Sequence, residues 1–175
     1  MSVTIPTTRD DHRIAWLTAL AITIHIAESV LPSPLPGVKP GLANVVTVIV
    51  LIQYGWTTAA WVALLRVLIG SLLIGTFLSP TFALSLAGAV ASLAVLRLAS
   101  CLPGRVYGPV GYSLLAALAH MAGQFWTDYG LFIPHDALLP LFPLLMSAAL
   151  VFGLVSGVVA GLTLKHLPVT GTTSP

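Results

Sequence analysis

The chain has 175 residues, of which 57% are hydrophobic and 7% are charged, and its formal net charge is +2. Because a soluble domain carries about 25% charged residues, this composition indicates one integral membrane domain and no nucleic-acid-binding surface. The single cysteine, Cys101, excludes an intrachain disulfide and offers no metal-binding or redox motif.

The first half of the chain predicts three membrane spans. Residues 1–13 are polar, and we expect them to form a frayed cytoplasmic tail. The first span covers 14–31, which is long enough to cross the hydrocarbon core. A short second span over 42–56 ends in aromatic residues typical of a membrane interface, and a third span covers 57–75.

The second half of the chain predicts three more spans. Connections that contain proline, glycine or aspartate separate them, as expected where a chain turns. In chain order the segments are the turn 76–80, the span 81–98, the loop 99–109, the span 110–127, the loop 128–138, the span 139–164 and the tail 165–175. The predicted fold class is therefore an all-α membrane protein with six transmembrane helices, in which residues 14–164 form the membrane domain.

A broken segment, PSPLPGVKPGLAN over residues 32–44, separates the first two spans. Proline fixes φ and removes an N–H group, so this Pro/Gly-rich segment cannot be regular helix. In a membrane protein such a segment is tolerated where it is buried in protein or lines a polar cavity. We therefore expect it to cover a binding site, with Lys39 and Asn44 at the entrance.

The distribution of basic residues predicts the orientation in the membrane. Six spans place both termini on one side, and the loops and tails of that side contain Arg9, Arg13, Arg97, Arg105 and Lys165. The opposite side contains one basic residue, Lys39. Since basic residues favour the cytoplasmic side, we expect both termini to be cytoplasmic in a multi-pass protein of the cell (inner) membrane.

Polar residues of three spans fall at a similar predicted depth. His25 and Glu28 in the first span, Arg66 in the third, and His120 and Gln124 in the fifth lie 9 to 14 residues from the cytoplasmic start of their spans. A charged group at this depth costs about 2.5–3.5 kcal/mol on insertion scales. Such groups face the protein interior and mark function, so we expect an outward-facing polar site for an anionic ligand.

Several of these residues also have simpler explanations. Arg66 can tie helices together through Glu28 or through backbone carbonyl groups. His25 can be a buried histidine that is satisfied by its neighbours, and the same applies to His120 beside Gln124. Lys39 can be an exposed lysine of an outer loop.

Small residues form two further stripes. Ala15 and Ala19 lie on one face of the first span, and Gly153, Gly157 and Gly161 lie on one face of the sixth. Such stripes let helices approach closely. For the glycines, packing within the domain is the favoured explanation. For the alanines, packing within the domain is also the favoured explanation, and docking on a partner is the alternative.

Four runs of sequence resemble a known family. They are PLPGVKPGLAN (34–44), LLRVLIGSLLIGTF (64–77), SPTFALSLAGAVAS (79–92) and HMAGQ (120–124). They resemble the Gx transporter family, often labelled heptaprenyl diphosphate synthase component I. That family is similar to the substrate-binding S components of energy-coupling-factor transporters. The resemblance implies an S-component-like bundle of six helices, a partner energising module and a docking role for Ala15 and Ala19.

Three functions compete on this basis. The favoured one is a non-enzymatic membrane component that binds a small, anionic molecule from outside for transport. It has no nucleotide-binding motif of its own, so a partner or a gradient must supply the energy. The alternatives are an accessory subunit of a polyprenyl diphosphate synthase and an accessory subunit of a redox system that uses flavin or quinone. We expect no bound cofactor, although His25 and His120 leave haem ligation open. For synthase catalysis the acidic residues are too few, since Asp10 and Asp11 form the one adjacent pair.

Overall fold

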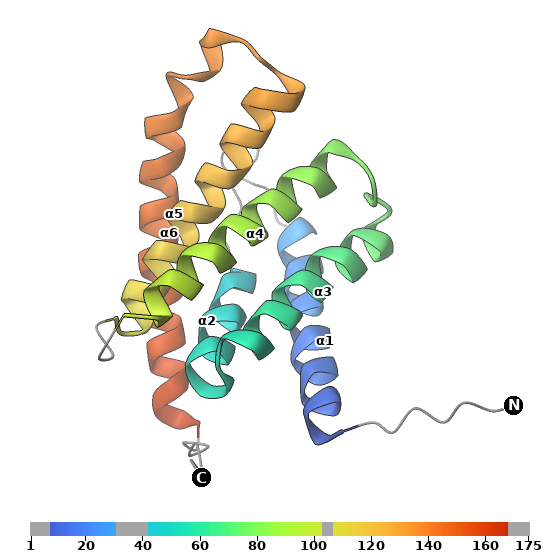
Figure 1. The fold of residues 1–175 in the computed structure, drawn as a ribbon, viewed down its shortest axis with the longest axis vertical. Coiled ribbons are helices and arrows are strands. Elements are labelled where there is room, and N and C mark those ends of the chain that lie inside the picture. The colour runs from blue at the N-terminus through green and yellow to red at the C-terminus, as the bar shows by residue number, and fades with distance from the viewer. Residues whose placement is uncertain (1–7, 31–41, 103–106, 168–175) are drawn as a thin grey trace, which may run out of the picture.

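The computed structural model describes residues 8–30, 42–102 and 107–167. Within these residues the chain forms α-helices and short helical turns, and no strand (Figure 1). The α-helices are α1 (Arg9–Val30), α2 (Leu42–Tyr54), α3 (Trp56–Ile74), α4 (Pro80–Ser100), α5 (Pro109–Thr127) and α6 (Leu141–His166). Between α5 and α6 lie η1 (Asp128–Phe132) and η2 (Asp136–Leu138). The expected all-helical class is confirmed, and each helix begins and ends within a few residues of a predicted span, except at the start of α1.

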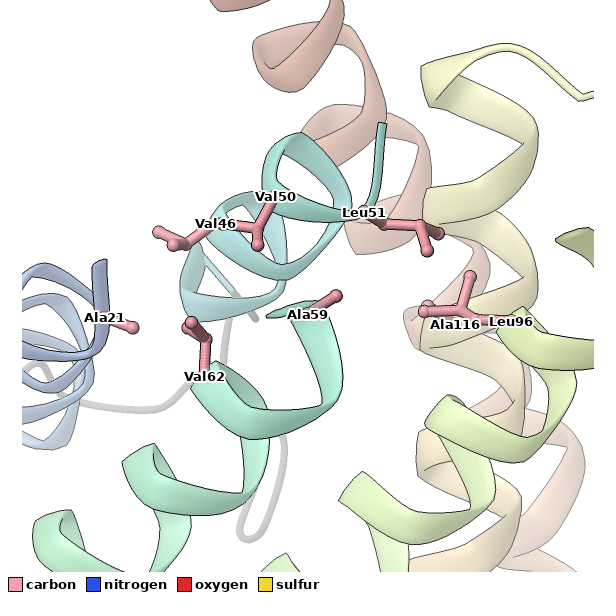
Figure 2. Packing of buried hydrophobic residues seen from close by; sticks show 8 residues of the cluster. All are labelled: Ala21, Val46, Val50, Leu51, Ala59, Val62, Leu96 and Ala116. Atoms are coloured by element: carbon pink, nitrogen blue, oxygen red, sulfur yellow. The ribbon is translucent and has the colours of Figure 1, made fainter. Parts of the chain in front are cut away.

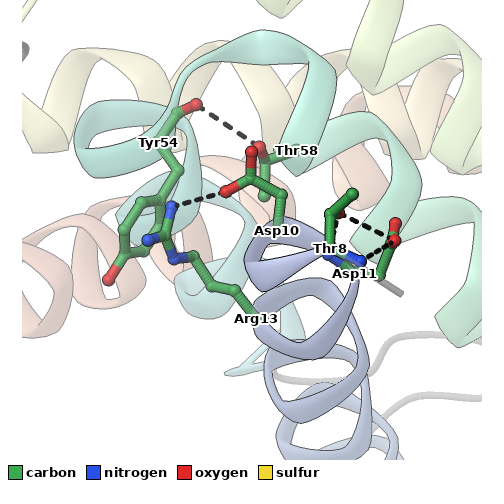
Figure 3. A network of polar contacts seen from close by, with 6 residues as sticks. All are labelled: Thr8, Asp10, Asp11, Arg13, Tyr54 and Thr58. Atoms are coloured by element: carbon green, nitrogen blue, oxygen red, sulfur yellow. Dashed lines mark hydrogen bonds and ion pairs between the residues drawn. The ribbon is translucent and has the colours of Figure 1, made fainter. Parts of the chain in front are cut away.

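The start of α1 differs from the sequence prediction. We expected residues 1–13 to be frayed, whereas the helix already begins at Arg9. The hydroxyl group and the backbone N–H of Thr8 both donate to Oδ2 of Asp11 at 2.8 Å, and the Asp11 N–H donates back to the Thr8 hydroxyl at 3.3 Å (Figure 3). This reciprocal cap satisfies N–H groups that a helix start otherwise leaves without partners.

Glycine and proline set the other helix boundaries. Gly55, with φ of 84°, separates α2 from α3, and Gly75 ends α3 in the left-handed conformation with φ of 78°. These φ values favour glycine because it has no Cβ. Helix α4 begins with Pro80 after Ser79, whose hydroxyl group accepts a hydrogen bond from the Phe82 N–H. Proline suits a first turn because the N–H that it lacks has no helical partner there.

Helix α2 lies at the centre of the bundle. It packs against α1, α3, α5 and α6. The main hydrophobic cluster gathers buried side chains from α2 itself and from α1, α3, α4 and α5 (Figure 2). Its members are Ala21, Val46, Val50, Leu51, Ala59, Val62, Leu96 and Ala116. Alanine and valine dominate, and their small size lets the helix backbones come close together.

Helix α6 packs through its glycine stripe, as the sequence predicts. A Cβ placed on Gly157 would lie 2.6 Å from Cα of Val110 on α5, and one on Gly153 would lie 2.9 Å from Cβ of Ala117. Gly161 is less crowded, because a Cβ there would lie 3.8 Å from Pro109. The glycine stripe therefore serves packing between α5 and α6.

Three helical stretches are long and apolar enough to cross a membrane. They are Trp56–Ile74, Pro80–Ser100 and Asp136–His166. Helix α2 is apolar but has 13 residues, fewer than the roughly 20 that a perpendicular span needs. Of the 18 consecutive residues that are most apolar in the Asp136–His166 stretch, 11% are buried inside the protein. Its exposed leucine and valine side chains present the kind of surface that faces lipid.

Helix α1 begins and helix α6 ends at the same end of the bundle (Figure 1), and cationic and aromatic side chains meet near this end. The guanidinium of Arg13 lies 4.7 Å from the ring centre of Tyr54, and that of Arg97 lies 5.2 Å from the ring centre of Trp56. Arg13 also pairs with Asp10 at 3.1 Å (Figure 3). The start of α1, the junction of α2 and α3, and the end of α4 are thus held together at one end of the bundle.

Candidate functional site: a buried cation beside two histidines

Arg66 is the charged side chain that lies deepest among the described residues. It is on α3 and is 9% exposed, whereas the other buried polar side chains of the described residues are neutral serines and threonines. A buried guanidinium is costly unless other groups hydrogen-bond to it or balance its charge. The surroundings of Arg66 are therefore the first place to look for chemistry.

Two histidines from other helices share this region. His120 on α5 is close enough to Arg66 and His25 for their charges to act on its ring. It also forms a hydrogen bond with the backbone of Gly88 on α4. His25 on α1 and His120 are both half-buried. Side chains that are far apart in the sequence, from α1, α3 and α5, are thereby brought together in one part of the bundle.

The fourth member of the group is Gln124, one turn beyond His120 on α5. It is half-buried, and its Cγ lies 2.9 Å from the position of a Cβ on Gly88. His120 and Gln124 therefore share the face of α5 that packs on α4, as their spacing of four residues predicts. We call His25, Arg66, His120 and Gln124 the polar group.

The remaining predicted residues fall elsewhere or outside the described residues. Asn44 is half-buried near the start of α2. Lys39 and the side chain of Glu28 lie outside the described residues. Ala15 and Ala19 are exposed on α1, next to Trp16, which is 78% exposed. Packing within this domain therefore does not account for the two alanines.

The structure adds residues that the sequence analysis did not single out. Gly70 on α3 and Gly88 on α4 carry no functional group, yet each lies against a histidine of the polar group. Gly70 follows Arg66 by four residues, so it lies on the same face of α3. This spacing was the one feature of the sequence that could have pointed to Gly70. Glycine is so common in membrane helices that such a spacing is not specific.

The polar group can supply hydrogen-bond donors and positive charge. A guanidinium offers five N–H donors in a planar fork that suits carboxylate and phosphate groups, and imidazole and amide groups add further donors. Within the described residues no cluster of three or more histidine, cysteine or acidic side chains is placed to bind a metal ion. These donors are of the kind that hydrogen-bond to carboxylate and phosphate groups.

Comparison with known proteins identifies the family. Residues 17–163 match the family described as heptaprenyl diphosphate synthase component I. The chain belongs to this family. The match includes every residue of the polar group and all six helices in whole or large part. Neither the curated proteins nor the solved structures contain a match to this chain.

Proposed function

We propose that this protein is a membrane component that captures a small, anionic molecule from the outer side and works with a partner energising module. The observation that supports this most directly is the buried Arg66 in one region with His25 and His120. A cation kept at such a depth is expensive and marks function. A carboxylate or phosphate group of a ligand would complement its charge and use the donors around it.

The proposed topology has six spans with both termini in the cytoplasm. It is supported by the end of the bundle at which Arg13 and Arg97 stack on Tyr54 and Trp56. Aromatic rings and basic side chains gather at membrane surfaces, and basic residues favour the cytoplasmic one. In this orientation we expect a ligand to reach the polar group from the outer side. We place the protein in the cell (inner) membrane.

The proposed partner docks on α1. Ala15 and Ala19 are exposed on this helix together with Trp16 and Leu20. Helix α1 packs on α2 and α3, which leaves this face available. Exposed small residues allow a second helix to come close in the membrane, and the resemblance to S components implies docking at the same two alanines. We propose that the protein itself is not an enzyme.

The family description favours a second candidate, an accessory membrane subunit of a polyprenyl diphosphate synthase. In that case the polar group would face a diphosphate, whose charge Arg66 would also complement. The two candidates differ in what accompanies the protein: a small molecule and an energising module, or a prenyl-transferring subunit.

Native mass spectrometry of the gently purified protein, with extraction of metabolites from the same sample, tests the proposal. We expect the wild type to carry a small anion and a membrane partner. Arg66→Ala should lose the anion and keep the partner, and Ala19→Trp should do the reverse. Lys165→Ala removes a positive charge from an exposed side chain, and Val151→Trp adds a ring to an exposed position of α6, so both should behave as the wild type.

Each outcome has a distinct meaning. A folded Arg66→Ala protein that keeps the anion would refute the binding role of Arg66. If Arg66→Ala does not fold, Gln124→Ala provides the same test with a neutral truncation. Unchanged partner binding in Ala19→Trp would refute docking on α1. A wild type that carries no anion and co-purifies with a prenyl-transferring subunit would support the second candidate.

A further inference from the structure

Each histidine of the polar group lies against a glycine of a neighbouring helix. A Cβ placed on Gly88 would lie 2.8 Å from both Cε1 and Nε2 of the His120 ring, and 2.9 Å from Cγ of Gln124. A Cβ placed on Gly70 would lie 3.3 Å from Cδ2 of His25. The two glycines are on α4 and α3, and the histidines are on α5 and α1.

The distances at Gly88 are too short for any side chain. Real Cβ atoms essentially never approach another heavy atom closer than 3.0 Å. His120 and Gln124 therefore occupy the space that a side chain at position 88 would fill. The His120 ring also hydrogen-bonds to the backbone of Gly88, so the ring is held against α4.

We propose that Gly88 is a positioning residue of the anion site: its missing side chain seats His120 and Gln124 against α4 and so determines where their polar atoms lie beside Arg66. This inference rests on the function proposed above for the polar group. A side chain at position 88 would push the ring and the amide away from α4. The site would then present its donors in the wrong place, although Arg66 itself would be unchanged.

Gly123 provides a matched control at the same interface between α4 and α5. A Cβ there would lie 2.7 Å from Cβ of Ala91 and 2.9 Å from the carbonyl oxygen of Ala87. These contacts are as short as those at Gly88, but they involve backbone and a methyl group and no member of the polar group. Gly123→Ala should therefore disturb packing without moving His120 directly.

The experiment compares Gly88→Ala, Gly123→Ala and Gly70→Ala in detergent, with ¹⁵N-labelled histidine. The chain contains five histidines, and His120→Asn identifies the ring signals of His120. In Gly88→Ala we expect these signals to shift or to be lost, while those of exposed His135 stay in place. Gly123→Ala should lower the unfolding temperature and shift the His120 signals by less than Gly88→Ala does, because its clash does not involve the ring itself. Gly70→Ala should shift the His25 signals by less, because 3.3 Å requires a displacement of only a few tenths of an ångström.

A second substitution that restores stability keeps the test decisive if Gly88→Ala folds poorly. Truncating the ring in the double variant Gly88→Ala/His120→Ala removes the shortest contacts, so the unfolding temperature should recover at least in part. No recovery would show that the His120 ring is not the obstacle at position 88 and would overturn the proposed seating of this ring by Gly88. Unmoved His120 signals in a folded Gly88→Ala protein would overturn it as well.

The same samples separate this proposal from the proposed function. The ring signals and the rescue require no ligand, so they report on positioning alone. If the wild type carries an anion, Gly88→Ala should lose it and Gly123→Ala should keep it. An anion retained in Gly88→Ala despite displaced ring signals would overturn the role of Gly88 in the site. A wild type without any anion, but with displaced ring signals in Gly88→Ala, would leave positioning intact and refute the anion site.

Discussion

Gly157→Ala tests how α5 and α6 are held together. The substitution adds one methyl group on the buried face of α6, where it would lie 2.6 Å from Cα of Val110 and 3.1 Å from Cβ of Ser113. The nearest atom belongs to the backbone of α5, so no side chain can rotate to make room. The two helices must therefore move apart or tilt.

The expected loss follows from comparing two opposing effects. Alanine favours a helix over glycine by about 0.5–1 kcal/mol, whereas overpacking a well-packed core costs typically about 1–3 kcal/mol. Because the obstacle is backbone, we expect a cost near the upper end of that range and a net loss of about 1–2 kcal/mol. At about 2–4 °C per kcal/mol for a chain of this size, the unfolding temperature should fall by roughly 2–8 °C.

Gly161→Ala is the matched control on the same helix. A Cβ at position 161 would lie 3.8 Å from the ring of Pro109, an ordinary van der Waals contact. This variant should keep the wild-type unfolding temperature or exceed it, because it gains helix propensity without a clash. Thermal unfolding of both variants, followed by circular dichroism in the same detergent, gives the comparison. Equal unfolding temperatures for the two variants would refute the packing of α6 on α5 described above.

Two further predictions concern polar contacts at the end of the bundle where α1 begins. The hydrogen bond from the Thr8 backbone N–H, and to a lesser extent that from the Thr8 hydroxyl, holds the pKa of Asp11 below its usual value of 3.8. Because the folded-state pKa is lowered, the cap stabilises α1 fully above pH 3.8. This stabilisation is lost as the pH falls through the folded-state pKa. Hydrogen-exchange protection in the first turn should fall at that acidic pH in the wild type and be low at every pH in Asp11→Ala, which removes the acceptor, and constant protection down to pH about 2 in the wild type would contradict this. Trp56 Nε1 donates to the Leu93 carbonyl at 3.1 Å, so Trp56→Phe should cost about 0.5–1.5 kcal/mol in the free energy of unfolding. Trp61→Phe, at an exposed position of α3, should cost much less, and similar losses in both variants would argue against this hydrogen bond.

Much of the helical architecture can be read from the sequence because the helix boundaries depend on local chemistry. Gly55, Gly75 and Pro80 mark ends that any neighbouring structure must respect, since their backbone preferences are intrinsic. The start of α1 was the exception, because the Thr8 and Asp11 cap lies within a polar segment that lacks the apolar periodicity of a span. A capping pattern alone, without that periodicity, is a weak indication of a helix.

The candidate site could be predicted from the sequence only in part. His25, Arg66, His120 and Gln124 stand out because polar side chains are costly in apolar spans, and that cost can be judged one residue at a time. Counting residues along each helix predicts a common depth for them, because the rise per residue is constant. The residue types and this predicted depth come from the sequence alone.

Contacts between helices depend on how the helices rotate and cross, and only the tertiary structure shows this. It places Gly88 beneath His120 and Gln124, brings Gly70 to His25, and leaves Ala15 and Ala19 exposed while Gly157 is buried against Val110. All of these are small residues, whose sequence pattern is the same whether they face lipid, a partner helix or a histidine ring. The sequence by itself determined the helices and the polar residues within them. Which faces meet was decided by packing, because a small residue acquires its role from the neighbour that fills the space beside it.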